Sequence, residues 1–130
     1  MTASPSVFDQ LASARYMLLT TFRRDGRAVA TPVWVMRDGD ALAVWTNADS
    51  GKVKRIRNDG RVTVVPCTMR GRPRGRAVPA VAEIPGPEQT AHFTELMQRK
   101  YGVQARLALL GSRLRAGGSN TVGLRVRLTD

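Results

Sequence analysis

The sequence reads Thr46-Asn47-Ala48-Asp49-Ser50-Gly51-Lys52-Val53-Lys54-Arg55-Ile56 between two apolar, strand-like runs. Asp49 or Ser50 can cap a short helix here, and Val53 and Ile56 give that helix an apolar i,i+3 pair. A helix therefore replaces the tight turn that usually joins two antiparallel strands. The connection is also the place where an anionic group can reach the ends of the strands.

The first turn of this short helix is basic. It contains Lys52, followed by Lys54 and Arg55, and two of the three lysines of the chain fall in this turn. A helix N-terminus carries partial positive charge, so each cation there costs a few tenths of a kcal/mol to about 1 kcal/mol unless an anion is bound. Free backbone N–H groups beside lysines suit a phosphate. The alternative at this point is an ordinary solvated helix.

Apolar alternation and turn signals along the rest of the chain predict a mainly β domain. Pro32 lacks a backbone donor and is expected at a sheet edge, at a bulge or beside a ligand. Leu107, Leu110 and Leu114 are expected on the apolar side of the last helix. Six antiparallel strands with a helical insertion before the last strand indicate a small closed barrel. The strands are expected at residues 15–22, 27–36, 41–46, 61–69, 77–84 and 121–128, and helices at 6–14, 86–102 and 104–114, besides the basic helix that ends near residue 58.

The composition limits the class of protein. The 130 residues suffice for one domain and one core. No apolar run approaches the ~20 residues that span a bilayer, so we expect no membrane partner. The single cysteine, Cys67, excludes an internal disulfide and suits a reducing compartment, which favours the cytoplasm. Cys67 also lies within an apolar run, where a buried structural role is favoured.

The formal net charge is +11, nearly all of it from arginine. It fits nucleic-acid binding, attraction of a polyanionic small molecule, or an arginine-biased coding sequence. The seven aromatic residues are scattered and no RNP-like, KH or zinc-finger pattern occurs, so we expect no nucleic-acid partner and keep a basic nucleic-acid binder as a minor alternative. The run from Arg70 to Arg76 is either a solvated hairpin tip or a cover for a polyanionic tail.

Side chains for catalysis are scarce. The only histidine, His92, is expected to be an exposed or packed helix residue, and one histidine builds no convincing Ser/His/Asp constellation. We therefore assign no catalytic residue and no metal ligand. If the protein is an enzyme, a bound cofactor must carry the reaction. Trp34 and Trp45 are expected in the core or at a dimer interface, and Trp34 can alternatively line a pocket for a flat ring.

Six segments occur in a characteristic order along the chain: Thr31-Pro32-Val33-Trp34-Val35, Ala43-Val44-Trp45-Thr46, Ser50-Gly51-Lys52-Val53-Lys54-Arg55-Ile56, Arg61-Val62-Thr63-Val64, Lys100-Tyr101-Gly102 and Leu110-Gly111-Ser112-Arg113-Leu114. In this order the chain resembles the pyridoxamine 5′-phosphate oxidase-like split β-barrel proteins, over about residues 8–128. Within that superfamily it is most similar to the branch that uses the deazaflavin coenzyme F420.

The resemblance implies a six-stranded split β-barrel with a few short helices, and a homodimer with two cofactor sites between its subunits. It implies an oxidoreductase that moves a hydride between reduced F420 and a small unsaturated organic substrate. The residues implied to line the deazaflavin ring are Thr31, Pro32, Val33 and Trp34. Those implied to hold the phosphate are Thr46, Ser50, Lys52 and Lys54, with Arg55 nearby and Asn58 as a further candidate.

Departures from the family pattern bear on the cofactor. The FMN-using pyridoxamine phosphate oxidases carry an Arg and a Lys on the second strand, where this chain has Ala30 and Val35. Their C-terminal Arg-His substrate motif is missing, and His92 is poorly placed as a haem ligand. F420 has a long anionic tail that a basic protein attracts. The alternatives are an FMN-binding oxidoreductase of the same fold and a non-catalytic F420-binding protein.

Overall fold

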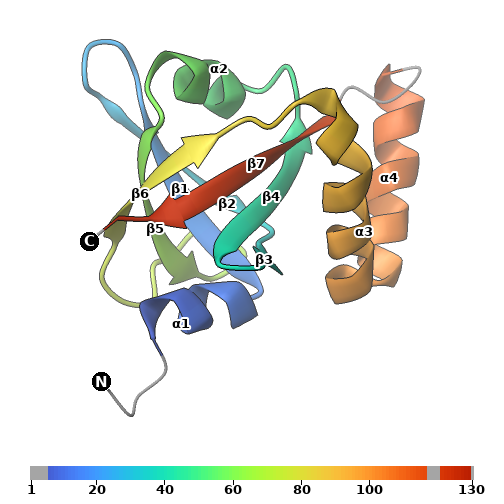
Figure 1. The fold of residues 1–130 in the computed structure, drawn as a ribbon, viewed down its shortest axis with the longest axis horizontal. Coiled ribbons are helices and arrows are strands. Elements are labelled where there is room, and N and C mark those ends of the chain that lie inside the picture. Colours follow the sequence, from blue (N-terminus) through green and yellow to red (C-terminus); the bar gives the residue numbers. More distant parts are fainter. Residues whose placement is uncertain (1–5, 117–120, 130) are drawn as a thin grey trace.

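The chain forms one antiparallel sheet of seven strands with helices at its ends and along one side (Figure 1). The computed structural model describes the backbone of residues 6–116 and 121–129, and the side chains of these residues except 112–116. The strands are β1 (Tyr16–Phe22), β2 (Ala28–Val33), β3 (Met36–Asp38), β4 (Ala41–Asn47), β5 (Arg61–Cys67), β6 (Val78–Glu83) and β7 (Thr121–Leu128). Their order in the sheet is β2-β1-β5-β6-β7-β4-β3.

The sheet curls because its two edge strands are neighbours in the sequence. β2 and β3 lie at opposite ends of the strand order, yet only Trp34 and Val35 separate them. The three steps from Val33 to Met36 span at most about 10 Å, so the two edges must come together. The result is a split-barrel-like sheet, which confirms the expected mainly β class. The expected strand count of six is wrong, because the run 27–36 breaks at Trp34 into two strands.

The remaining elements are the helices α1 (Val7–Ser13), α2 (Gly51–Asn58), α3 (Thr90–Tyr101) and α4 (Val103–Ala116), and the 3₁₀ turn η1 (Pro87–Gln89). α1 and α2 lie at opposite ends of the barrel, and α3 covers one side with α4 outside it (Figure 1). Gly102 joins α3 to α4 with a φ of 58°, a left-handed conformation that glycine adopts without steric cost.

Two apolar cores stabilise this arrangement. The first fills the barrel, where the inward side chains of alternating strand residues such as Leu19, Val44 and Leu124 meet Val53 and Ile56 of α2. The second lies between α3 and the outer face of the sheet. It contains Met36, Ala43, Phe93, Met97, Tyr101 and Ala105, with Trp34 and Trp45 packed against it. Both tryptophans are partly buried against this core, which agrees with the first of the two expected positions, and a dimer interface stays a prediction.

The expected apolar side of the last helix, α4, is exposed in the structure. Leu107 and Leu110 are 65% and 55% exposed rather than buried. α4 packs through Ala105 and Leu109 instead, because it meets the rest of the protein through α3 and leaves its opposite face uncovered. The side chain of Leu114 lies outside the described residues.

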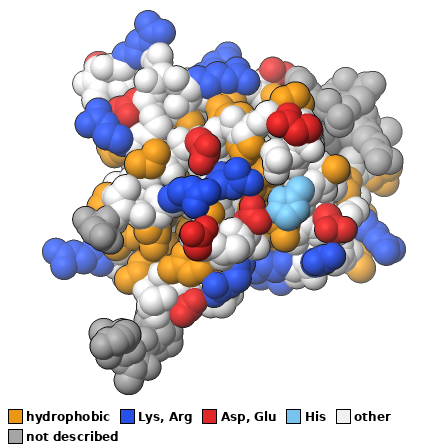
Figure 2. Space-filling view, in the orientation of Figure 1, with side chains coloured by type: hydrophobic (Ala, Val, Ile, Leu, Met, Phe, Trp, Pro, Cys, Tyr) orange, Lys and Arg blue, Asp and Glu red, His pale blue; other side chains and the backbone are white. Residues whose placement is uncertain are grey.

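Several single-residue expectations can be checked directly. Pro32 lies on the edge strand β2, and Cys67 is buried, as expected. Burial raises the pKa of the Cys67 thiol. His92 is exposed on α3, and its Nε2 lies 2.9 Å from Oδ1 of Asp38, whose other oxygen accepts a hydrogen bond from Arg125. Figure 2 shows His92 among acidic and basic side chains on this face. Among the described helices, none is long and apolar enough to cross a membrane.

Candidate functional site

The first turn of α2 presents a buried hydroxyl that lacks a partner. Ser50 precedes the helix in an extended conformation, but its side chain makes no capping hydrogen bond. Its Oγ is buried and has no hydrogen-bond partner among the described residues. A buried polar atom left unpaired costs about 1–3 kcal/mol, so a hydrogen bond from this hydroxyl to a bound water or ligand atom would be stabilising.

Arg55 folds back over the same turn. Its Nε donates a hydrogen bond of 2.6 Å to Oγ1 of Thr21, a buried residue of β1. A methyl group built on Gly51 would lie 2.7 Å from the nearest guanidinium nitrogen of Arg55. Side chains on a helix lean toward its N-terminus, which brings this guanidinium to the start of α2 although Arg55 belongs to its second turn. Glycine at position 51 leaves the space that the guanidinium occupies.

Positive charge is concentrated around this turn. Burial, and then repulsion by Arg55, lowers the pKa of Lys52. Burial, and then repulsion by Arg23, lowers the pKa of Arg55. The first turn of α2 has no acidic residue, and the helix N-terminus adds its own partial positive charge. Because each of these effects disfavours a cation, the attraction of a bound anion at this position would offset their combined cost. We call Ser50, Lys52 and Arg55, with Thr21 and Arg23, the cationic turn.

The other residues implied to hold a phosphate lie in different surroundings. Thr46 is buried near the end of β4. Lys54 is exposed to solvent. Asn58 is the last residue of α2, about 12 Å along the helix from Ser50, and its Oδ1 accepts a hydrogen bond of 3.4 Å from Arg24. The structure therefore brings Ser50, Lys52 and Arg55 together and leaves Asn58 at the far end of the helix.

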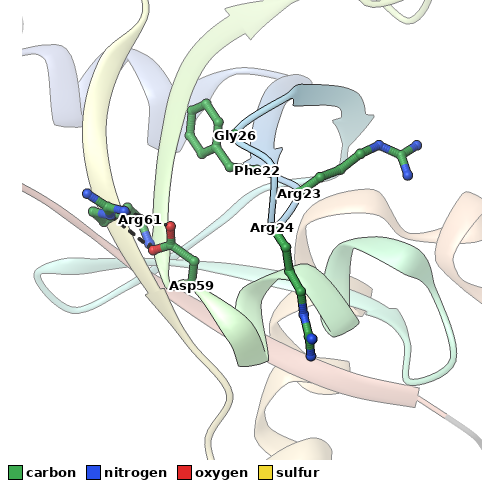
Figure 3. Close-up of a pocket in the computed structure, with 6 residues that line it drawn as sticks. All are labelled: Phe22, Arg23, Arg24, Gly26, Asp59 and Arg61. Carbon is green, nitrogen blue, oxygen red and sulfur yellow. Dashed lines mark hydrogen bonds and ion pairs between the residues drawn. The ribbon is translucent and has the colours of Figure 1, made fainter.

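Asn58 instead borders an open pocket beside the β1–β2 hairpin. This pocket has a volume of about 470 Å³ and is lined by Asn58 together with Phe22, Arg23, Arg24, Asp59 and Arg61. A second pocket, of about 340 Å³, shares these residues except Asn58 and adds Gly26. Figure 3 shows the side chains of Arg23 and Arg24 pointing away from each other, while Asp59 is paired with Arg61. Because its cations do not converge on one point, this pocket is a weaker anion site than the cationic turn.

The residues implied to line a ring are divided between the two faces of β2. Thr31 and Val33 pair with Leu19 and Met17 and share their inward side, whereas Pro32 is exposed on the outer side. Thr31 lies nearest to the cationic turn, because its partner Leu19 is two residues, about 7 Å, from Thr21.

The side chain of Trp34, which directly follows β2, packs against α3. Its ring stacks on Tyr101 of α3, with ring centroids 4.4 Å apart and planes within 9°. The four residues are therefore continuous in the sequence without forming one surface.

The arginine-rich loop lies beside the same strand. A methyl group built on Gly71 would lie 3.7 Å from Cδ of Pro32, so the loop packs close to the outer side of β2. Its backbone is ordered by hydrogen bonds such as the one from Arg74 N to Pro66 O, at 2.7 Å. The four guanidinium-bearing residues Arg70, Arg72, Arg74 and Arg76 are all exposed.

Sequence reasoning missed Thr21 and Arg23, which come to the cationic turn from β1 and the following hairpin. The available signal was the alternation Met17, Leu19, Thr21, which places a polar side chain at an inward position. Among the described residues, no group of three or more His, Cys, Asp or Glu side chains can hold a metal ion.

The comparisons with known proteins agree with this fold. The family model described as pyridoxamine 5′-phosphate oxidase matches residues 4–128. The chain belongs to this family. No curated protein matches the sequence.

Solved structures similar to this member of the family have been assigned different roles. The heme storage protein HutZ from Vibrio cholerae superposes with a TM-score of 0.71 at 11% identity, covering 100% of this chain and 92% of that one. A protein described as an F420 reductase gives 0.58 at 19%, covering 98% and 97%. A FAD-binding protein from Mesorhizobium loti gives 0.59 at 15%, covering 92% and 83%. At these identities the similarity shows the fold alone.

Proposed function

We propose that this protein is an F420-dependent oxidoreductase acting on a small unsaturated organic substrate. The observation that carries the proposal is the cationic turn, where a half-buried lysine, an arginine and an unpaired buried hydroxyl converge on a helix N-terminus. When bound, the coenzyme supplies the hydride. This chain supplies an anion site and the strand β2 nearby, and no side chain is assigned as a proton donor.

The fit to the coenzyme rests on the chemistry of the donors. The Lys52 ammonium, the Arg55 guanidinium and the Ser50 hydroxyl can all donate to a phosphate. Charge-assisted hydrogen bonds of this kind are about twice as strong as neutral ones. The exposed arginines of residues 70–76, beside Pro32, offer further cations for the anionic tail that distinguishes F420 from FMN.

Two further considerations favour F420 over the other groups bound in this fold. Ala30 and Val35 replace the Arg and Lys expected of FMN-using members. The single histidine, His92, is paired with Asp38 on the outer side of the sheet, away from the cationic turn, which disfavours haem. The similarity to a protein described as an F420 reductase is compatible with this choice.

A competition experiment tests the proposal. The protein is dialysed against equal concentrations of F420 and FMN, and the absorption spectrum of what it retains is recorded. We expect the deazaflavin spectrum, and oxidation of reduced F420 when an accepted substrate is added. Retention of FMN would contradict the choice of cofactor. Retention of F420 without turnover across a broad substrate panel would favour a non-catalytic binding protein, and retention of neither, with salt-dependent binding to random DNA, would favour a nucleic-acid binder.

A homodimer is the assembly we propose. The helices α3 and α4 cover only the β7-β4-β3 side of the sheet. On the outer face of the other strands, directly paired residues form an uncharged row, which consists of Pro79, Thr63, Thr20 and Ala30. Val81, on the same face, is 44% exposed. The row itself is free of charge, although Val81 is flanked by its strand partners Arg61 and Arg127. An uncharged row of this kind suits contact with a second copy.

The dimer makes a prediction about mass in solution. We expect a dimer by sedimentation, and a shift toward the monomer in Ala30→Arg, because a charge at the β2 end of this row must be desolvated on association. Gln98→Arg, which adds the same charge on the exposed side of α3, should leave the dimer intact. A dimer that is unaffected by Ala30→Arg would place the interface elsewhere.

A further inference from the structure

The crossover between β2 and β3 is held by side chains instead of by a neighbouring strand. Val35 N–H donates to the hydroxyl of Tyr101 at 3.0 Å, and that hydroxyl also lies 3.1 Å from Val35 O. Val35 O accepts a further hydrogen bond, of 2.6 Å, from the ammonium of Lys100. Two consecutive residues of α3 thus satisfy both backbone groups of a buried residue that belongs to no strand.

Lys100 connects this crossover to the end of α1. Its ammonium donates to Ala12 O at 2.9 Å and to Ala14 O at 2.6 Å, in addition to Val35 O. An ammonium has three N–H donors, so all three are used on main-chain carbonyls. The last turn of α1 contains no basic residue. Lys100 therefore provides, from α3, the cation that favours a helix C-terminus.

Tyr101 carries the same network to Trp34. The two rings stack at 4.4 Å, and the tyrosine hydroxyl is fixed by its hydrogen bond of 2.8 Å to Arg15 O. The Arg15 guanidinium lies 4.9 Å from the centre of the Tyr101 ring. Trp34 immediately follows Val33, the last residue of the edge strand β2.

We propose that Lys100 and Tyr101 are positioning residues that fix Trp34 and, through it, the end of β2, the edge strand that receives the ring of the coenzyme. The inference rests on the proposed function for the ring, while the hold on Trp34 is a property of the protein alone. Neither residue belongs to the cationic turn, so the two proposals can fail separately.

The hydrogen bonds that hold Trp34 in place depend on pH, because Lys100 makes all of its bonds only when it is charged. Burial, and then repulsion by Arg15, lowers the pKa of Lys100 to about 8. The other titratable groups around the network are Tyr101, whose pKa burial raises to about 12, and Tyr16. Tyr101 therefore stays protonated while Lys100 titrates. Once Lys100 is neutral it has only two N–H donors for three carbonyls, and one hydrogen bond is lost.

Raising the pH loosens the contacts around Trp34 but has the opposite effect on the global stability of the protein. The pKa of Lys100 is lower in the folded protein than its ordinary value of 10.5, so between about pH 8 and 10.5 the unfolded state binds more protons. Stability from this group therefore rises with pH in that window. A loosening of Trp34 over the same range would thus not reflect global unfolding.

The test follows Trp34 alone, in a Trp45→Phe background. We expect acrylamide quenching of Trp34 to rise about twofold between about pH 6.5 and 9, and the affinity for F420 to fall about threefold, the loss expected for one hydrogen bond. Lys100→Arg keeps its charge and should hold quenching low at both pH values. Lys100→Met should give the high value at both.

Each outcome of this experiment decides the inference. Quenching that is independent of pH in the parent protein, or equally dependent on pH in Lys100→Met, would overturn it. If Lys100→Met does not fold, the contrast between the parent and Lys100→Arg gives the same decision. If quenching behaves as expected while F420 does not bind at any pH, the hold on Trp34 stands and the proposed function fails. If quenching behaves as expected and F420 binds equally well at both pH values, the hold does not position the ring and the inference is overturned.

Discussion

Lys52→Ala is expected to weaken F420 binding at least tenfold, measured by titration of the fluorescence of the ring. The reason is the loss of a charge-assisted contact to phosphate, which is worth about 1.5–3 kcal/mol. Because burial and Arg55 both disfavour the charge of Lys52 in the folded protein, we expect Lys52→Met to unfold at the same temperature as the parent protein or above it. A lower F420 affinity in Lys52→Ala, together with an unchanged melting temperature in Lys52→Met, would show that Lys52 binds the coenzyme and does not stabilise the fold.

Two variants of the same helix serve as controls. Arg57→Ala removes an exposed positive charge at the other end of α2 and should leave the affinity nearly unchanged. Lys54→Ala should have a smaller effect than Lys52→Ala, because Lys54 is exposed. Inorganic phosphate should raise the melting temperature of the parent protein more than that of Lys52→Ala. Equal losses of F420 affinity in Lys52→Ala and Arg57→Ala would show that the cationic turn contributes only through the net charge of the protein.

Gly123→Ala is expected to destabilise the protein by about 3 kcal/mol, at the upper end of the usual cost of overpacking a core. Gly123 lies on β7 directly under the fully buried ring of Phe93. A methyl group at Gly123 would lie 2.6 Å from Cε2 of Phe93 and closer still to Cγ and Cδ2. Since the ring has no free space to move into, α3 must shift away from the sheet. Denaturant unfolding measures the loss.

Gly111→Ala is the matched control for this substitution. Gly111 lies within α4, and a methyl group built there has no neighbour within 4 Å. Alanine is a better helix former than glycine by about 1 kcal/mol, so this variant should be as stable as the parent or more stable. If both variants unfold like the parent protein, Phe93 does not pack on Gly123 as described.

Local patterns predicted most of the fold. The last strand, residues 121–128, was predicted with the bounds it has, because Val122, Leu124, Val126 and Leu128 alternate strictly with other residues. The break after Val33 was not predictable, because nothing local marks it. The hydrogen-bond partners that replace a strand there belong to Lys100 and Tyr101, 65 and 66 residues further along the chain.

The sequence also did not show which face of the outer helix, α4, is buried. Leu107 and Leu110 have the spacing of a buried stripe, yet α4 turns Ala105 and Leu109 toward α3. A periodic pattern shows that a helix has an apolar side, but only its packing partners decide which side is covered. The structure therefore shows an apolar surface where the pattern predicted a core.

The candidate site was predictable where it is local. Ser50, Lys52 and Arg55 fall within six residues, so fewer than two turns of helix bring them close together. Thr21 and Arg23 reach the same place only because β1 passes beside α2. The separation of Asn58 from the cationic turn was also predictable, because eight residues of helix place it at the opposite end of α2.

The two strands that border the split also bear on the tendency of the sheet to aggregate. An unpaired strand edge invites another chain to add to the sheet. Here β2 carries Pro32, which cannot donate a backbone hydrogen bond, and β3 is only three residues long, with Arg37 at its centre. Each edge therefore offers an incoming strand an interrupted or very short template. The opening that gives the barrel its shape is thereby a poor starting point for fibril growth.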